Sequence, residues 1–310
     1  MGGLNGGLGK EAGGGVRPPA AMSGFVHDSR IARIIELALI EDAAMGDLTS
    51  EAVISQELVG SGVFLCKEDG VIAGLEVAAM VFHLADPGVS FAAEVPDGSA
   101  VSAGRQIARV DGPLREILKA ERTALNFLQR MSGIATLTRE FVRAVEGTGA
   151  RITDTRKTAP GLRLLDKQAV RLGGGVNHRF GLDDMVLIKD NHIAAAGGVG
   201  EALRRCRLSL NALGISVPVE VETRSLKEVE EAMATGGFQR IMLDNFPLGG
   251  MRQAVRRIDG VVEVEASGGI TLANVRETAE TGVDFISVGA LTHSVRALDI
   301  CLEILPSPPA

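Results

Sequence analysis

The half of the chain that follows Gly149 alternates short apolar segments with amphipathic ones, and this rhythm limits the possible folds more than any other feature. Six runs have the character of strands: "ARITDT", "DMVLIK", "VPVEVET", "RIMLDN", "VVEVEAS" and "DFISVG". Helix-like segments such as "SLKEVEEAMATG" and "TLANVRETAETG" separate them. Strands that alternate with helices of this length predict a parallel sheet, closed into a β/α barrel or open and doubly wound.

Polar residues at the end of every run favour the barrel. They are Asp154–Lys157, Lys189–His192, Glu220 and Glu222, Asp244 and Asn245, Ser267–Gly269, and Gly289 with Ala290. A β/α barrel builds its active site at the C-terminal ends of its strands. Helix capping would explain one or two such ends, but six in succession predict a functional site.

The part before Gly149 has a different rhythm. Apolar residues at helical spacing predict a helix over residues 29–44. Residues 60–112 have short apolar runs broken by Gly, Pro and Asp-Gly, which is typical of a small sheet with turns. "LEVAAMVFHLA" is expected to lie across that sheet as a helix. A long helical stretch begins near Leu114, and Gly133 is expected to bend or divide it. The closing "THSVRALDICLEIL" is predicted to be a helix, and residues 1–21 a flexible Gly-rich tail.

A basic window lies within an acidic protein. Between Arg151 and His192 there are eight Lys or Arg and five Asp, whereas the whole chain has a net charge of −7. Arg offers a planar fork suited to carboxylates and phosphates, and Lys a mobile point charge. The cluster predicts a ligand with several anionic groups; its members are Arg156, Lys157, His178, Arg179 and Lys189.

Other basic residues of this window have a plainer interpretation. Arg163, Lys167 and Arg171 recur at helical spacing and are predicted to form a solvated face, from which one side chain could reach inward. His192 is predicted to be a core residue. For His178 the sequence leaves a core position and a site position open.

Small residues follow the last two strands, in "VEASGGIT" and "ISVGALT". Glycine lets a backbone approach an oxyanion closely, and the N–H groups at a helix N-terminus favour an anion. Either stretch alone is equally consistent with ordinary capping. The pair favours a phosphate site, which β/α barrels commonly have at this position.

Two acids are expected beside this anion site, Glu222 and Asp244. They would repel an anionic ligand unless they meet hydroxyl groups or a cation, and ribose with Mg²⁺ satisfies both conditions. Glu220 shares the strand face of Glu222 by the period of two, so it either contributes or pairs internally. These residues together indicate a phosphorylated sugar that meets a multiply charged anion.

Composition excludes several classes of protein. Tyr and Trp are absent and the chain is acidic, which argues against a nucleic-acid surface. The three isolated cysteines form neither a disulfide framework nor a zinc site. No apolar run approaches the ~18 residues that span a membrane, and the start lacks the apolar stretch of a signal peptide. We expect a cytoplasmic protein that binds neither nucleic acid nor membrane.

The motifs closely resemble the quinolinate phosphoribosyltransferase (decarboxylating nicotinate-nucleotide pyrophosphorylase) family. They include "ALIEDAAMGDLTS", "ERTALNFLQRMSGIAT", "DTRKTAPGLR", "GGGVNHRFGLDDMVLIKDNHI", "VEVET", "MLDN", "EASGGIT" and "VGALTHS", in order from about Ser29 to His293. The resemblance implies transfer of phosphoribose from 5-phosphoribosyl 1-pyrophosphate to quinolinate, with Mg²⁺, to give nicotinate mononucleotide, pyrophosphate and CO₂. It implies an α/β fold with an open-faced sandwich domain over residues 22–125, joined by a C-terminal helix over 292–310, and an incomplete β/α barrel over 126–291.

The resemblance also implies roles for single residues. Lys157, Lys189, Glu222 and Asp244 would be catalytic, and the two acids would contact Mg²⁺ indirectly, through substrate and water. The family works as a homodimer or homohexamer in which Arg122 reaches the neighbouring subunit's site. The residues implied to bind the substrates are Arg122, Thr155, Arg156, Lys157, His178, Arg179, Lys189, Glu222, Asp244, Ser267, Gly268, Gly269, Gly289, Ala290 and Leu291.

Three other interpretations are open to a chain with these features. A nicotinate phosphoribosyltransferase or a molybdenum-transport-associated homologue would share the fold, but the crowded cations favour a diacid substrate. A barrel lyase or isomerase would share the phosphate site without needing pyrophosphate. A non-catalytic sensor would bind quinolinate, but the acids Glu222 and Asp244 would then have no purpose.

Overall fold

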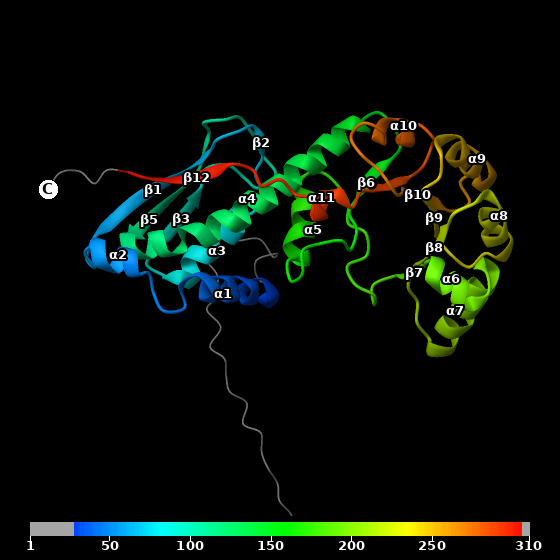
Figure 1. The fold of residues 1–310 in the computed structure, drawn as a ribbon, viewed down its shortest axis with the longest axis horizontal. Coiled ribbons are helices and arrows are strands. Elements are labelled where there is room, and N and C mark those ends of the chain that lie inside the picture. Colours follow the sequence, from blue (N-terminus) through cyan, green and yellow to red (C-terminus); the bar gives the residue numbers. More distant parts are fainter. Residues whose placement is uncertain (1–27, 306–310) are drawn as a thin grey trace, which may run out of the picture.

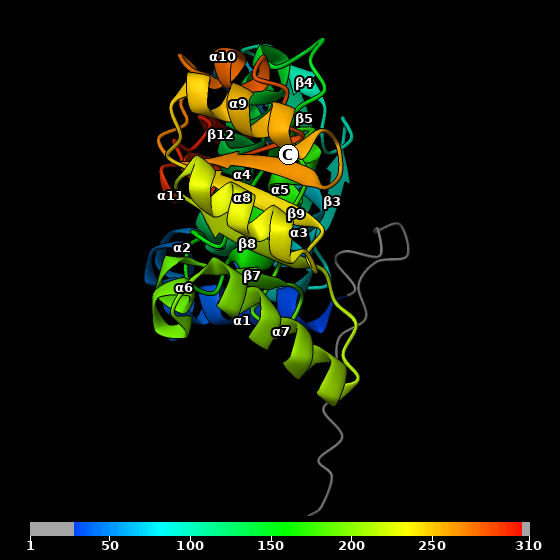
Figure 2. The same cartoon turned by 90° about the vertical axis from the view of Figure 1, so that its right-hand side faces the viewer.

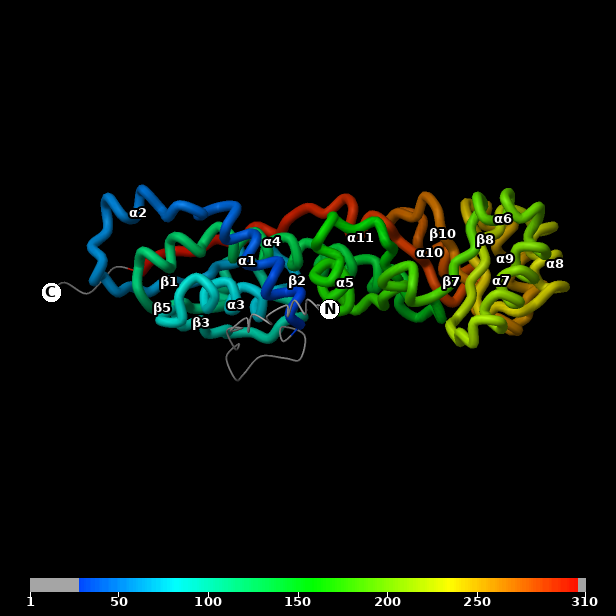
Figure 3. The backbone as a smooth tube through the Cα atoms, turned by 90° about the horizontal axis from the view of Figure 1, so that it is seen from below, coloured from blue at the N-terminus to red at the C-terminus, as the bar shows by residue number. Residues whose placement is uncertain are grey.

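The computed structural model describes residues 28–305, which form two lobes along the long axis of the molecule (Figures 1 and 3). The first lobe is built on an antiparallel sheet and the second on a parallel one. The tail predicted for residues 1–21 lies outside the described residues, as do residues 22–27 and 306–310. No helix within residues 28–305 is both long and apolar enough to cross a membrane.

The sheet of the first lobe has helices on one face only. Its strand order is β12-β1-β5-β3, and Phe64, Phe82 and Phe91 pack beneath it with ring centroids 5.5–5.9 Å apart. The other face carries ion pairs such as Lys67–Glu303 at 2.8 Å. This arrangement confirms the open-faced sandwich. Its elements are α1 (Ser29–Ala43), α2 (Leu48–Val53), β1 (Val59–Cys66), β2 (Gly70–Val71), α3 (Leu75–Ala85), β3 (Ser90–Ala93), β4 (Ala100–Val101) and β5 (Gln106–Pro113).

One unbroken helix, α4 (Leu114–Ala144), runs from the first lobe to the second (Figure 1). The expected division of this helix at Gly133 is therefore wrong. Gly133 instead permits a close approach, because a Cβ at this position would lie 2.1 Å from the backbone oxygen of Arg296. The expected domain boundary at residues 125–126 falls inside this helix.

The helix predicted over residues 292–310 is also wrong within the part that the structure describes. The short α11 (Ala290–His293) ends almost at once, and the chain returns to the first lobe as β12 (Ile300–Ile304). β12 pairs antiparallel with β1, with Ile300 opposite Cys66 and Ile304 opposite Gly62. A five-residue apolar run suits either state by itself, and the edge of β1, far away in the sequence, selects the strand.

The second lobe holds six parallel strands in the order β6-β11-β10-β9-β8-β7. In the part of the chain described, β6 and β7 do not pair with each other, and a single bridge between Thr153 and Val176 extends the β6 edge. Helices α7, α8 and α9 cover the outside of the strands (Figure 2). The lobe is thus an incomplete β/α barrel, as predicted. Its elements are β6 (Arg151–Thr153), α5 (Arg163–Leu172), β7 (Val186–Ile188), α6 (Asp190–Ala196), α7 (Val199–Leu213), β8 (Val219–Thr223), α8 (Leu226–Thr235), β9 (Arg240–Asp244), α9 (Leu248–Ile258), β10 (Glu263–Ser267), α10 (Val275–Ala279) and β11 (Phe285–Ser287).

Candidate active site

A cavity of about 180 Å³ opens at the C-terminal ends of the barrel strands. Most of the predicted site residues line it, although they come from loops and strands up to 112 positions apart, from Thr155 to Ser267. The lining also includes Leu187, Met242, Glu265 and Ser287, which the sequence analysis did not single out. The predicted residues that line it are Thr155, Arg156, Lys157, His178, Arg179, Lys189, Glu222, Asp244 and Ser267.

The pleat of the strands sorts the inward-facing side chains into layers. Glu222, Asp244 and Ser267 are the last inward residues of β8, β9 and β10, and Asp244 stands in register with Ser267. Because alternate residues of a strand share a face, Glu220 and Glu265 lie one layer deeper. The upper residues therefore face the ligand space, and of the two deeper acids only Glu265 still lines it.

Two arginines form the basic wall of the cavity. Arg179 is 8% exposed, and its Nη1 donates a hydrogen bond to the backbone oxygen of Met185 at 2.9 Å. Burial, and then the positive charge of Arg156, lowers the pKa of Arg179. The Nε of Arg156 is buried without a hydrogen-bond partner among the described residues. Adjacent guanidinium groups with a free donor are suited to bind carboxylates or phosphates.

His178 forms part of the wall, with both ring nitrogens turned to protein atoms. Its Nδ1 accepts a hydrogen bond from the backbone N–H of Arg179 at 2.8 Å, which places the ring proton on Nε2. Nε2 lies 3.0 Å from Oε2 of Glu220 and 3.5 Å from Oε2 of Glu265, without hydrogen-bond alignment. His178 is thus both a buried residue and a lining residue, so the two alternatives left open by the sequence overlap.

Two acids lie beneath His178 in the interior of the barrel. Glu220 and Glu265 are fully buried, and burial raises the pKa of each carboxyl to about 7. The charge of Glu220 raises the pKa of Glu265 further, while Arg240, 3.3 Å from Glu265, opposes this. Glu220 therefore lies against His178 inside the barrel and does not line the cavity, and neither of its carboxylate oxygens is hydrogen-bonded within the described residues. Glu265 was missed, although its place two residues before Ser267 in an apolar run signals an inward acid.

Glu222 and Asp244 meet a cation that the sequence analysis also missed. The guanidinium of Arg224 lies 2.8 Å from Oδ2 of Asp190, 3.4 Å from Oδ2 of Asp244 and 3.7 Å from Oε1 of Glu222. Burial, and then the charge of Asp244, raises the pKa of Glu222. The only sequence signal was a basic residue two positions after Glu222.

Lys167 corrects the prediction of a solvated face. It is 3% exposed, and its Nζ lies 2.5 Å from Oδ1 of Asp154 and 2.9 Å from the backbone oxygen of His178. Arg171, one turn later on α5, is exposed as predicted. Lys167 belongs to the inward face because the C-terminal end of β6 supplies a buried carboxylate for it.

His192 corrects a second prediction. The residue is exposed and does not belong to the core. Its Nδ1 accepts a hydrogen bond from the backbone N–H of Lys189 at 3.0 Å, so it caps the start of α6. Capping by the third residue of a helix follows from local geometry that apolar periodicity does not reveal.

The small residues predicted to bind phosphate lie at the ends of β10 and β11. Gly268 has φ +96°, and a Cβ there would lie 2.2 Å from Oδ1 of Asn245. A Cβ at Gly289 would lie 3.2 Å from Cδ of Lys157, so the two predicted clusters adjoin. Gly268, Gly269, Gly289, Ala290 and Leu291 do not line the cavity themselves, and Leu291 is fully buried.

Arg122 is the predicted residue that lies apart from the others. It is exposed on α4, in the half of the helix that belongs to the first lobe, and does not line the cavity of its own chain.

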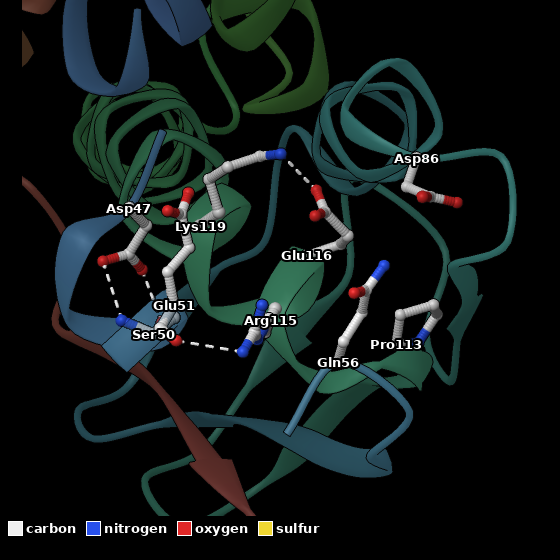
Figure 4. Close-up of a pocket in the computed structure, with 9 residues that line it drawn as sticks. All are labelled: Asp47, Ser50, Glu51, Gln56, Asp86, Pro113, Arg115, Glu116 and Lys119. Atoms are coloured by element: carbon white, nitrogen blue, oxygen red, sulfur yellow. Dashed lines mark hydrogen bonds and ion pairs between the residues drawn. The ribbon is translucent and has the colours of Figure 1, made fainter. Parts of the chain in front are cut away.

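A larger cavity of about 410 Å³ lies in the first lobe, between α2 and the start of α4 (Figure 4). Asp47 accepts hydrogen bonds from Thr49 and Ser50 as the N-cap of α2, and Lys119 pairs with Glu116. Arg115 donates to backbone oxygens of Glu51 and Ile54. Arg115 thereby ties the end of α2 to α4, and none of the predicted site residues lines this cavity.

Both lobes are similar to known proteins. Residues 47–132 match the family model described as quinolinate phosphoribosyl transferase, N-terminal domain, and residues 134–303 match that of the C-terminal domain. The chain is 47% identical to "Quinolinate phosphoribosyltransferase [decarboxylating] 2b, mitochondrial" of Nicotiana tabacum, over 93% of this chain and 85% of that one. It is 42% identical to "Probable nicotinate-nucleotide pyrophosphorylase [carboxylating]" of Bacillus subtilis (strain 168), over 89% and 93%. Among solved structures, NadC from Streptococcus pyogenes is 38% identical with a TM-score of 0.85, over 93% and 100%.

Proposed function

The chain belongs to the quinolinate phosphoribosyltransferase family, and from that premise we propose how its cavity performs the reaction. The enzyme transfers the phosphoribosyl group of 5-phosphoribosyl 1-pyrophosphate to quinolinate with decarboxylation, a step of NAD biosynthesis that gives nicotinate mononucleotide, pyrophosphate and CO₂. One observation carries the assignment of residues: Arg156 and Arg179 lie on one cavity with Glu222 and Asp244. The cations are thus available to the anionic groups of the substrates, and the acids to the positive charge that develops on the ribose.

The cations are assigned to the anionic groups. Arg156 and Arg179 hold the carboxylates of quinolinate, supported by the free Nε of Arg156. Lys157 and Lys189, exposed at the rim, bind phosphate oxygens as mobile charges. The remaining assignments follow the same logic: Thr155 and His178 complete the quinolinate site, and Ser267–Gly269 with Gly289–Leu291 hold the 5′-phosphate.

The acids are assigned to the charge that develops on the sugar. As pyrophosphate leaves, positive charge builds on the ribose C1, and Glu222 and Asp244 stabilise it electrostatically. The pyridine nitrogen then attacks C1. The positive charge on that nitrogen stabilises the electron pair that stays on C2 when the 2-carboxylate leaves as CO₂, and a proton from solvent then adds to C2 to give nicotinate mononucleotide. Positioning and charge perform these steps, and no covalent nucleophile is needed.

Mg²⁺ fits the same acids. Glu222 and Asp244 are close enough for the charge of Asp244 to raise the pKa of Glu222, so a cation between them relieves an existing repulsion. They would hold the ion indirectly, through substrate and water, which agrees with the preference of Mg²⁺ for keeping waters. When bound, Mg²⁺ neutralises the negative charge of the leaving pyrophosphate.

The exposed position of Arg122 supports a site shared between subunits of a homodimer or homohexamer. In this proposal Arg122 of one subunit completes the quinolinate site of its neighbour. R122A and K157A should each be inactive alone, and mixing them under subunit exchange should restore about a quarter of the wild-type activity, because half of the dimers then hold one intact site. Activity that stays at the sum of the two single variants contradicts the shared site.

The reaction assignment is tested by measuring pyrophosphate and CO₂ release with quinolinate, 5-phosphoribosyl 1-pyrophosphate and Mg²⁺, with nicotinate as the matched control. Equal release of both products with quinolinate alone is expected. Pyrophosphate without CO₂, appearing only with nicotinate, would overturn the substrate and retain the phosphate site. Release of neither product would favour a sensor or a lyase.

We place the reaction in the cytoplasm as part of this proposal. Plant relatives are named mitochondrial or chloroplastic, so location varies among similar proteins. Fractionation of cells that express the whole chain tests this placement, and recovery with an organelle contradicts it.

A further inference from the structure

Arg224 spans the ends of three neighbouring strands. Asp190 follows β7, Glu222 belongs to β8 and Asp244 ends β9, and one guanidinium lies 2.8–3.7 Å from a carboxylate oxygen of each. The side chain of Arg224 is 55% exposed. Ion pairs hold the Arg224 side chain in this position more than apolar packing does. The side chain can therefore leave with little loss of buried apolar surface.

The position that this guanidinium occupies is defined by excess negative charge. Three carboxylates face one arginine, and the charges of Asp244 and Asp190 both act on Glu222. Lys189 is the other cation that acts on Glu222. A divalent ion drawn to Glu222 and Asp244 would enter the same negative potential, and the guanidinium already in that potential repels it.

We propose that Arg224 is the resident countercation of Glu222 and Asp244, and that a divalent cation displaces it on binding. This inference rests on the proposed role of the two acids toward Mg²⁺. In the substrate-free enzyme Arg224 neutralises the acids and lowers their affinity for a free metal ion. Arg224 is thus a positioning residue: it sets when the acids become available to the ion.

The test is a Mn²⁺ titration of the full chain without substrates, followed by electron paramagnetic resonance of the free ion. R224Q removes the charge and keeps most of the side chain, so Mn²⁺ should bind about tenfold tighter than to the wild type. R224K keeps the charge and should stay near the wild type. R257Q is the matched control, because Arg257 is an exposed arginine paired with Glu230 on the outer helices, and it should change nothing. Adding D244N to R224Q should abolish the gain.

A second readout uses thermal stability and no activity. Removing Arg224 leaves three acids without their shared cation, so R224Q should melt at a lower temperature than the wild type, and Mg²⁺ should raise its Tm more than that of the wild type. Equal Mn²⁺ affinity of wild type and R224Q, with D244N still weakening the binding, would overturn the inference and leave the proposed function intact. Mn²⁺ binding that D244N does not affect, or none in any variant, would also overturn the inference, whereas the proposed function fails only if quinolinate and 5-phosphoribosyl 1-pyrophosphate release no pyrophosphate and CO₂.

Discussion

The Nζ of Lys167 lies 2.5 Å from Oδ1 of Asp154 in the interior of the second lobe, and the same Nζ reaches the backbone oxygen of His178 at 2.9 Å. Asp154 in turn accepts a hydrogen bond from the backbone N–H of His178 at 2.9 Å. This buried pair therefore ties the end of β6 to the loop that carries His178 and Arg179. The basic wall of the cavity depends on a pair that does not line it.

K167M tests this dependence. Removing the cation leaves Asp154 buried without its ion partner, so we expect a loss of about 3–5 kcal/mol in the free energy of unfolding, measured by urea denaturation. Arg171 lies one turn away on the same helix and is exposed, so R171Q should change stability by no more than about 0.5 kcal/mol. Similar stabilities for the two variants would contradict a structural role for the pair.

Replacement of the basic residues should act on catalysis more than on folding. K157A and R179A each remove a cation from a cavity that binds anionic substrates, and we expect kcat/KM to fall by about 100–1000-fold, corresponding to ~3–4 kcal/mol of transition-state stabilisation. Steady-state kinetics with both substrates measures this. K227A, an exposed lysine on α8 that does not line the cavity, is the control. Near-normal kcat/KM in both variants would overturn the assignment.

Glu265 should make stability depend on pH. Its pKa is raised to about 7 in the folded chain from an ordinary 4.5, so between these values the folded state binds a proton that the unfolded state releases. The free energy of unfolding should therefore fall as pH rises from about 4.5 to about 7.

E265Q should reduce this fall by about 1–3 kcal/mol, measured by urea unfolding at pH 5 and pH 7.5. E263Q, at an exposed position of the same strand, should keep the wild-type pH dependence. An E265Q profile that matches the wild type would show that another group titrates.

Gly133 should be essential to the junction between α4 and the returning chain. In G133A the new methyl group meets the backbone oxygen of Arg296, which cannot move without shifting the segment that leads into β12, so we expect a loss of about 1–3 kcal/mol. Gly249 lies in α9 with open space around it, and G249A should raise stability by about 0.5–1 kcal/mol. Chemical denaturation of both variants measures the difference, and a stabilised G133A would exclude the close approach.

Local patterns in the sequence predicted most of the helices and strands. Helical spacing located α1 and α3 to within one residue, and the alternation of apolar runs with amphipathic segments predicted the parallel strands of the barrel. These local patterns gave wrong predictions where contact with a segment far away in the chain decides the structure. Residues 300–304 form a strand because β1 offers an edge. Gly133 lies inside a helix, where the absence of a side chain leaves room for the backbone at Arg296.

The candidate site divides in the same way. Strand-end polarity and the basic window placed Thr155, Arg156, Lys157, Arg179 and Lys189 in one site, because parallel strands end at the same edge of a barrel and bring such residues together. The sequence did not show whether a charged side chain at that edge faces the ligand space or pairs with another residue of the protein. Two basic side chains show this: Lys167 is buried against Asp154, whereas Arg224 lies across three acids.

The sequence by itself determined the order of the barrel strands, the β/α class of the second lobe and the chemical types gathered at the strand ends, because periodicity and strand-end residues are local properties of the chain. Only the tertiary structure decided which charges pair with each other. Glu220, Glu265 and His178 meet inside the barrel, and Arg224 meets Asp190, because β7, β8, β9 and β10 lie side by side in one sheet. Register depends on packing among segments far apart in the sequence, and the free energy of a buried charge depends on which partner that packing supplies.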